Sequence, residues 1–430
     1  MNVLAYTSPA RGHLNPMMGP LLELARRGAT VYVRTLEPAV AGVRAAGVHC
    51  LPIDPRIEAI ALEDYRGTSP PDALRRTFDA WGRRAQLEVE DFRRAVRECA
   101  PDVALVDTTT FGAKAAAEAL GLPWAESRPF LLEDAQPGVP VFPFGFKPAR
   151  GPLARARDWL LRHAVARLEA KTRMPMINAS RAAAGLPPLT TVADSRHRAP
   201  LTVYFTATPF EYERPLPRGV VMVGAADWEP AGDLPSDVPD RALVLVTCSS
   251  EYQDDAAIAA AALEGLPPTD RLVVTTAGVD PAKLPARPGA IVRRYLPHGP
   301  LLERAAVVIC HGGMGITQKA LLHGVPVCVV PWARDQLEVA ARVEVAGAGV
   351  ALSRRRLTPE RLAEAVERAR RCVDGARRVR EGYEKTGGSA AAADALERLA
   401  RASAASSPGD GAPTKVRDES VKVVSSSNSL

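Results

Sequence analysis

Glycine and polar residues suited to binding a phosphate gather in one stretch, His311 to Gln336, which reads HGGMGITQKALLHGVPVCVVPWARDQ. The apolar run 305–310 directly before it predicts a buried parallel strand. Gly312, Gly313 and Gly315 form the turn that follows, and residues 317–323 predict a short helix. Unpaired N–H groups and the helix dipole favour an anion at such a helix N-terminus. The stretch therefore predicts a phosphate site rather than a turn in which glycines serve packing alone.

A second candidate for chemistry lies near the N-terminus, where the predicted strand 3–6 and a short loop lead into a helix that starts at His13. An ordinary histidine pKa of about 6.5 suits a general base near neutral pH. Asp107 ends another predicted strand, 103–106, and ligands of open α/β sheets bind at such strand ends. We expect Asp107 to orient the imidazole and to stabilise the imidazolium. The simpler alternatives are a helix cap for His13 and a polar strand end for Asp107.

The elements that must position these residues form two α/β series. Residues 1–224 contain the first series, and residues 225–240 are rich in Pro, Gly and Asp, which is typical of a linker. The second series spans 241–385. A final helix is expected at 386–402, and the Ser-, Pro- and Gly-rich residues 403–430 are expected to be disordered. A chain of 430 residues suits two domains, so the predicted fold class is α/β, with two doubly wound Rossmann-like domains.

The motifs together resemble family 1 glycosyltransferases, especially the bacterial natural-product branch. That family's pattern is His-x-Gly-x-Gly-Ser/Thr, then Gly-x-Pro, then Pro-x-x-x-Asp-Gln, and its N-terminal element is Gly-His-x-Asn-Pro. The N-terminal element is matched here by Gly12, His13, Asn15 and Pro16. The resemblance spans most of residues 1–403. It implies the GT-B fold, with the active site in the cleft between the domains and the last helix crossing back to the first domain.

The resemblance implies an inverting transferase that moves a sugar from a dTDP- or UDP-sugar to a hydroxyl of a hydrophobic natural product, such as a polyketide, macrolide, enediyne or phenolic compound. His13 would be the base, aided by Asp107. The donor diphosphate would contact His311, Gly312, Gly313, Gly315, Ile316, Ser249 and Ser250. The nucleobase and ribose would contact Tyr295, Leu296, His298 and Lys319, and the donor sugar would contact Trp332, Asp335 and Gln336.

The acceptor is expected against an apolar segment, since small-molecule sites are mostly apolar with few polar groups. The residues predicted for it are Trp81, Phe142, Phe144, Phe146 and Met174. Core packing is the alternative for this segment and for Tyr295, and a helix N-cap is the alternative for Ser249 and Ser250.

Two positions depart from the family pattern. Ile316 replaces a Ser or Thr, so a hydroxyl is lost while the backbone N–H remains. Lys319 replaces a Glu that binds ribose hydroxyls in many relatives, which favours dTDP over UDP as the donor nucleotide. No Asp-x-Asp follows an apolar strand, so we expect no metal cofactor, with protein dipoles in place of a divalent ion.

Composition restricts the other possibilities. The net charge is +6, but no basic cluster is interleaved with aromatic residues, so we expect no nucleic-acid partner. The six cysteines lack zinc-site spacing, which favours reduced thiols in the cytoplasm. No stretch has the length of a signal core or a membrane span, so no stable membrane association is expected. The expected partners are the donor and the acceptor, bound by a monomer or homodimer.

Three other functions remain open on the sequence. A GT-B nucleotide-sugar 2-epimerase needs no acceptor pocket, which the N-terminal element and the apolar loops speak against. A non-catalytic binding homologue would fit Ile316 and Lys319 but has no need of a base. An NAD-linked dehydrogenase is poorly supported, because the first turn lacks Gly-x-Gly-x-x-Gly.

Overall fold

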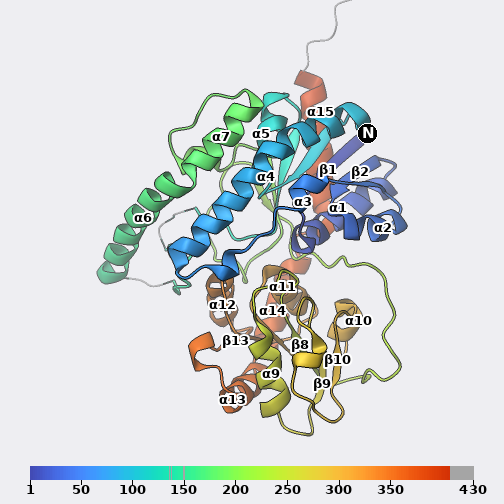
Figure 1. Ribbon diagram of the computed structural model, residues 1–430, viewed down its shortest axis with the longest axis vertical. Coiled ribbons are helices and arrows are strands. Elements are labelled where there is room, and N and C mark those ends of the chain that lie inside the picture. Colours follow the sequence, from blue (N-terminus) through green and yellow to red (C-terminus); the bar gives the residue numbers. More distant parts are fainter. Residues whose placement is uncertain (135, 137, 149–150, 407–430) are drawn as a thin grey trace, which may run out of the picture.

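The computed structural model describes residues 1–134, 136, 138–148 and 151–406, which form two α/β units (Figure 1). The sheet of the first unit has seven parallel strands in the order β3-β2-β1-β4-β5-β6-β7. Its strands are β1 (Asn2–Tyr6), β2 (Thr30–Thr35), β3 (His49–Pro52), β4 (Val103–Asp107), β5 (Trp124–Arg128), β6 (Leu201–Tyr204) and β7 (Val220–Met222). Strand β4 is buried along its whole length, as its continuous apolar run predicts for a parallel strand covered on both faces.

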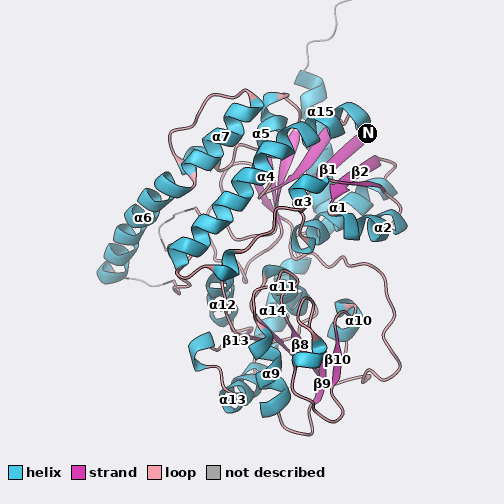
Figure 2. Cartoon of the chain, viewed as in Figure 1, coloured by secondary structure: helices cyan, strands magenta, loops and turns pink. Residues whose placement is uncertain are grey.

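The helices of the first unit cover both faces of this sheet and extend beyond it (Figure 2). They are α1 (Arg11–Arg26), α2 (Glu37–Ala45), α3 (Pro55–Glu58), η1 (Asp64–Arg66), α4 (Pro70–Cys99), α5 (Phe111–Ala119), α6 (Pro152–Thr172), α7 (Met174–Ala184) and α8 (Val192–Ser195). The sequence predicts helix throughout 54–100, but the structure divides this region. Ser69 caps α4 by accepting a hydrogen bond from the N–H of Asp72, and the prolines that follow favour a helix start there.

The second unit has six parallel strands in the order β10-β9-β8-β11-β12-β13. They are β8 (Leu243–Thr247), β9 (Arg271–Thr275), β10 (Ile291–Arg293), β11 (Ala305–Cys310), β12 (Val327–Val329) and β13 (Gly349–Ala351). The helices are α9 (Ala256–Gly265), η2 (Pro281–Lys283), α10 (His298–Leu302), α11 (Met314–Leu322), α12 (Gln336–Val345), η3 (Arg354–Arg356), α13 (Pro359–Arg370) and α14 (Val373–Glu384). Two parallel α/β sheets confirm the predicted fold class.

Two helix boundaries differ from the sequence prediction. Helix α11 begins at Met314 rather than 317, so that Gly315 lies inside its first turn. Helix α14 continues through 374–378, where the pattern predicts a break. The break lies instead before α15, where Gly387 has a φ of +81°, a conformation that favours glycine.

The last helix, α15 (Gly388–Ser406), crosses back and packs on the first unit beside α1 (Figure 1). Ala392, Ala393 and Leu396 are fully buried in the hydrophobic cluster that also holds Leu21 of α1. This confirms the crossing that the resemblance implies. Residues 403–406, which the sequence assigns to the tail, belong to this helix instead, because the Ala-rich residues 402–405 favour helix and α15 runs on to Ser406. The rest of that predicted tail, 407–430, lies outside the described residues.

A buried ion pair joins the two units. Arg342 of α12 is 2% exposed, and its Nη2 lies 3.1 Å from Oε1 of Glu211 in the first unit. Its Nη1 lies 2.9 Å from Oε2 of Glu338 in the same helix, and Glu338 in turn accepts a 2.8 Å hydrogen bond from the N–H of Gly145. Within the described part of the chain, no helix is both long and apolar enough to cross a bilayer.

Candidate active site

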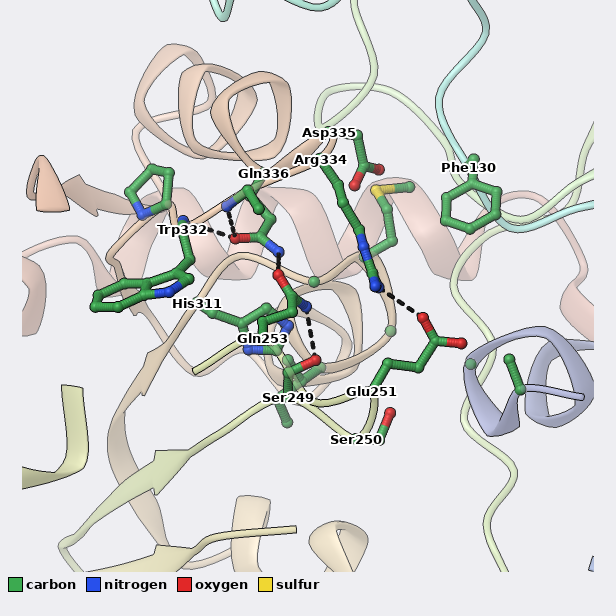
Figure 3. Close-up of a pocket in the computed structure, with 18 of the residues that line it drawn as sticks. Phe130, Ser249, Ser250, Glu251, Gln253, His311, Trp332, Arg334, Asp335 and Gln336 are labelled. Carbon is green, nitrogen blue, oxygen red and sulfur yellow. Dashed lines mark hydrogen bonds and ion pairs between the residues drawn. The ribbon is translucent and has the colours of Figure 1, made fainter. Parts of the chain in front are cut away.

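A cavity of about 3300 Å³ lies between the two units and takes its walls from both. The first unit contributes the start of α1, one face of α4 and the loop after β5. The second contributes the loops after β8 and β12, the start of α11 and the segment around α10. These are mainly the carboxyl ends of parallel strands, where α/β proteins bind ligands. Figure 3 shows the second unit's wall with Phe130 of the first unit facing it.

His13 and Asp107 meet as the sequence predicts. Nδ1 of His13 lies 2.8 Å from Oδ1 of Asp107, and both side chains are buried. The carboxylate also accepts hydrogen bonds from the backbone N–H groups of Ser8, at 3.0 Å, and Thr109, at 3.2 Å. His13 lines the cavity, whereas Asp107 lies behind it. The ring of Phe130, which the sequence analysis missed, packs edge-on against the imidazole at 4.8 Å.

The pair shifts both pKa values. Burial lowers the pKa of His13, but the charge of Asp107 and its hydrogen bond outweigh burial, so the pKa of His13 rises above 6.5. Burial alone would raise the pKa of Asp107, yet the charge of His13 and the hydrogen bonds from His13 and Ser8 lower it to about 2. Asp107 is therefore an anion throughout the neutral range, and His13 gains proton affinity from it. This is the arrangement that a general base requires.

The opposite wall presents the start of α11. Its first turn leaves the N–H groups of residues 314–316 without helical acceptors. Gly312 has a φ of +91°, and a Cβ there would lie 2.7 Å from Cγ1 of Val329, so only glycine fits this turn. A Cβ on Gly313 would lie 2.5 Å from Nε2 of His311. The side chain of Ile316 packs against the core, which leaves its backbone N–H at the helix start.

His311 stands at this helix start in a different electrostatic setting. It is 7% exposed, and its Nδ1 lies 3.7 Å from Oδ2 of Asp255, beyond hydrogen-bond distance. Burial, with the positive charge of Arg334, lowers the pKa of His311 to about 4. A neutral imidazole with one N–H donor therefore faces the predicted phosphate position.

A chain of hydrogen bonds links the loops around this position (Figure 3). Gln336 accepts hydrogen bonds at its Oε1 from the N–H groups of Trp332, at 2.7 Å, and of residue 333, at 2.9 Å. Its Nε2 donates to Oε1 of Gln253 at 2.7 Å, and Nε2 of Gln253 donates to Oγ of Ser249 at 2.7 Å. The Gln336 amide thus supports the loop that carries Asp335, and its predicted contact with the sugar stays a prediction.

Two more predicted residues line this wall. Asp335 has a buried Oδ2 without a hydrogen-bond partner, and burial raises the pKa of Asp335 to about 6. An unpaired carboxyl oxygen aimed at a cavity suits a hydroxyl donor. Ser250 is exposed in the loop after β8, whereas Ser249 beside it is buried. Neither serine is the N-cap of the following helix α9, where Asp255 stands instead.

Arg334, which the sequence analysis passed over, bridges the two units. Its guanidinium holds Asp64 of η1 through Nε, at 2.8 Å from Oδ2, and Nη2, at 3.0 Å from Oδ1. Its Nη1 lies 2.6 Å from Oε2 of Glu251. The rings of Tyr65 and Tyr252 meet edge-on at 5.2 Å beside this bridge. The bridge therefore ties the loop that carries Asp335 to the first unit across the cavity.

Some of the residues predicted to contact the nucleobase line the cavity, and one does not. Tyr295 is 59% exposed and lines the cavity, which rules out the core-packing alternative. The predicted contact of Leu296 with the nucleobase is wrong, because this side chain is buried in the core of the second unit and lies outside the cavity wall. His298 lines the wall, and its backbone N–H donates to Glu229 at 2.9 Å. Burial lowers the pKa of His298.

Lys319 is not a lone cation. Its Nζ lies 3.1 Å from Oε2 of Glu229 and 3.6 Å from Oδ1 of Asp227, both in the segment predicted as a linker. The replacement of the family's Glu by Lys319 therefore does not leave this region without carboxylates. The local motif contains no carboxylate, but the linker folds back and supplies two.

Only some of the residues predicted to contact the acceptor line the cavity. Trp81, Phe142 and Phe144 line the cavity on the first unit's side. Phe146 does not line it, since its ring lies under the guanidinium of Arg157 at 4.2 Å. Met174 also lies outside the wall, in a small core cluster behind Trp81. An apolar pattern alone does not separate a pocket wall from the core beneath it.

Two α/β units of this topology around a shared cavity, with a helix start on one wall and a histidine–aspartate pair on the other, are the arrangement that the resemblance to GT-B glycosyltransferases implies. Residues 263–394 match the model of the C-terminal domain of erythromycin biosynthesis protein CIII-like proteins. The chain is 30% identical over 386 residues to 4'-demethylrebeccamycin synthase of Lentzea aerocolonigenes, a span of 85% of this chain and 90% of the relative. The chain therefore belongs to the GT-B glycosyltransferases of natural-product pathways.

Other relatives agree with this family. A PGL/p-HBAD biosynthesis rhamnosyltransferase of Mycobacterium bovis is 40% identical over 157 residues, 35% of this chain and 34% of the relative. The solved structure of the kitacinnamycin glycosyltransferase superposes with a TM-score of 0.69 at 22% identity, over 93% of this chain and 98% of that one. The glycosyltransferase VinC in complex with dTDP superposes with a TM-score of 0.68 at 19% identity, over 94% and 100%. These structures share the fold.

Proposed function

We propose that this enzyme transfers a sugar, with inversion, from a dTDP- or UDP-sugar to a hydroxyl of a hydrophobic natural product. The observation that carries the proposal is the 2.8 Å contact between Nδ1 of His13 and Asp107 on the cavity wall opposite the start of α11. A base on one wall and an anion site on the other suit transfer across the space between them.

In this reaction the acceptor hydroxyl gives its proton to Nε2 of His13, because Nδ1 is held by Asp107. The hydroxyl oxygen forms a bond to the anomeric carbon while the bond from that carbon to the diphosphate oxygen breaks. Attack on the face opposite the leaving group inverts the configuration. Asp107 stabilises the imidazolium that forms, and its low pKa keeps it charged while it does so.

The leaving diphosphate takes the electron pair of the broken bond, and its growing charge needs fixed donors. The free N–H groups at the start of α11 and the neutral imidazole of His311 supply them in a largely dry wall. Because these donors are held in place before the reaction, we propose that transfer needs no divalent metal. Asp335 is the donor-sugar contact that its unpaired buried oxygen supports.

The donor nucleotide is proposed to be dTDP or UDP. Relatives of the same fold include VinC, solved with dTDP, which supports the first. Tyr295 offers an exposed ring for base stacking, and the Lys319–Glu229 pair offers both a cation and a carboxylate near the ribose. Turnover of both donors by Lys319→Glu tests this pair, and an unchanged UDP/dTDP preference would show that Lys319 does not set it.

A thermal-shift series tests the proposed donor class. UDP, dTDP, GDP and NAD are each added with magnesium and with EDTA. A ligand that binds only the folded state adds about 2.7 kcal/mol at a hundredfold excess over its Kd. We expect stabilisation by dTDP or UDP that EDTA leaves unchanged. Stabilisation by NAD alone, or by no nucleotide, would contradict the proposal.

A further inference from the structure

Arg84 of α4 is a buried cation that the proposed reaction does not use. It is 7% exposed, and it shares a helical face with Thr77 and Trp81, at spacings of four and three residues. All three line the cavity on the acceptor side. The ring of Trp81 packs 5.8 Å from that of Phe111, so the helical face that carries Arg84 also carries an aromatic contact.

Arg84 forms no salt bridge in the described part of the chain. Its Nε donates to the carbonyl of Ile60 at 3.0 Å, its Nη2 donates to the same oxygen, and no described carboxylate forms an ion pair with it. Burial lowers the pKa of Arg84, the direction expected when desolvation disfavours the charged form. A buried cation is costly unless it is paired.

The acidic residues near Arg84 all form hydrogen bonds or ion pairs with other groups. Glu88, one turn along α4, accepts a 2.9 Å hydrogen bond from the N–H of Gly112, and burial raises the pKa of Glu88 to about 8. It is therefore mostly uncharged at neutral pH. Asp107 is paired with His13, and Asp64 and Glu251 are paired with Arg334. Arg84 therefore forms no salt bridge, although the charges of Glu251 and Asp107 attract it at longer range.

We propose that Arg84 binds a carboxylate of the acceptor, so that the acceptor class is an aromatic hydroxy acid. This inference rests on the proposed function, because it uses the same cavity and the same base. The Ile60 carbonyl fixes one side of the guanidinium, and the other N–H groups are left to form charge-assisted hydrogen bonds. The aromatic body of the acceptor lies against Trp81, and its hydroxyl faces His13. Arg84 is a specificity-determining residue in this account.

The test uses matched acceptors. The hydroxybenzoic acids and hydroxynaphthoic acids are compared with their methyl esters, as substrates and, by ligand-observed NMR, as ligands of the full chain. Hydrogen bonds to charged groups are worth about 1.5–3 kcal/mol, so we expect the wild-type enzyme to prefer at least one acid over its ester by about 10- to 100-fold. Arg84→Met should remove that preference, and Arg84→Lys should keep part of it.

The controls separate this role from a structural one. If Arg84 only supports the Ile60 loop, Arg84→Met weakens acid and ester equally, which would overturn the inference. A wild-type enzyme that shows no preference for any acid would overturn it without a variant. Binding of dTDP should not change in Arg84→Met, and a loss there would assign Arg84 to the donor instead. Continued transfer to the esters without an acid preference would leave the proposed function standing while the inference fails.

Discussion

Two histidines occupy similar places in the two halves of the molecule. His13 and His311 each follow a parallel strand and stand at the start of a helix that faces the same cavity. His13 has a carboxylate at 2.8 Å and a raised pKa, whereas His311 lies 3.7 Å from Asp255 and has a pKa of about 4. Position in the fold therefore does not decide what a histidine does. A carboxylate within hydrogen-bond distance suits His13 to the proposed role of base, whereas His311 has no carboxylate that close and stays neutral.

The largest effect is expected from removing the base. General-base catalysis is typically worth about 10²–10⁴-fold, so His13→Ala should lower kcat by about 10³-fold. The affinity for dTDP or UDP should stay within about twofold, since His13 lies on the opposite wall. Turnover and nucleotide titration on the same sample measure both quantities. Retained kcat in a folded His13→Ala protein would remove the distinction between the two histidines.

Removing only the carboxylate should give a smaller loss. Asp107→Asn keeps the shape of the pair but loses the charge, so we expect kcat to fall by about 10²–10³-fold. Activity measured across pH 5–9 gives this number, with Asp102→Asn, on an exposed acid at the opposite end of β4, as the control. Equal losses in the two variants would show that the Asp107 effect is not specific to the pair.

The donor-side histidine should affect binding more than chemistry at the base. His311→Ala removes the hydrogen bond that we propose to the diphosphate, so Kd for dTDP should rise about tenfold. The pH dependence of kcat/KM should keep its shape, because a group with a pKa of about 4 does not titrate between pH 5 and 9. Calorimetric titration and a pH series measure these effects. A displaced pH profile would mean that His311 also holds the proton being transferred.

The smallest effect is expected at the bridge between the halves. Asp64→Asn weakens the bidentate hold on Arg334, whose side chain is 26% exposed, so the loss of stability should be only about 1 kcal/mol. KM for the donor should rise by about two- to threefold, because the loop that carries Asp335 loses its anchor in the first unit. Thermal unfolding and initial rates test this. A loss as large as that of His13→Ala would place Arg334 in the chemistry itself.

The sequence was most informative where local pattern decides the structure. Continuous apolar runs predicted the parallel strands, and the strand ends placed His13 and Asp107 together although they are 94 residues apart. The glycines around His311 predicted the start of α11, with an error of three residues. Both results follow from the rule that ligands lie at the carboxyl ends of parallel strands.

Polar contacts between residues far apart in the sequence could not be predicted from local pattern. Arg334 and Asp64 are 270 residues apart, and neither sequence neighbourhood indicates the other. Glu229, in the segment predicted as a linker, pairs with Lys319 because the chain folds back there. No motif near either residue indicates this contact. Phe146 and Met174 were predicted to contact the acceptor because an apolar side chain gives the same local signal in a core and in a pocket wall. Leu296 was assigned to the nucleobase through the resemblance, which does not show that its side chain lies in the core.

The most direct test of the account is the pH profile of kcat/KM for the wild type and Asp107→Asn. The pKa of His13 is raised by Asp107, so the neutral base accumulates only as pH rises through a value above 6.5, and activity should rise with it. Without the charge of Asp107, burial is the largest remaining influence, and it lowers the pKa of His13. The account predicts that the rising limb moves to lower pH in Asp107→Asn while the plateau falls. A limb that stays in place in the variant, or that is missing in the wild type, would contradict His13 as the base.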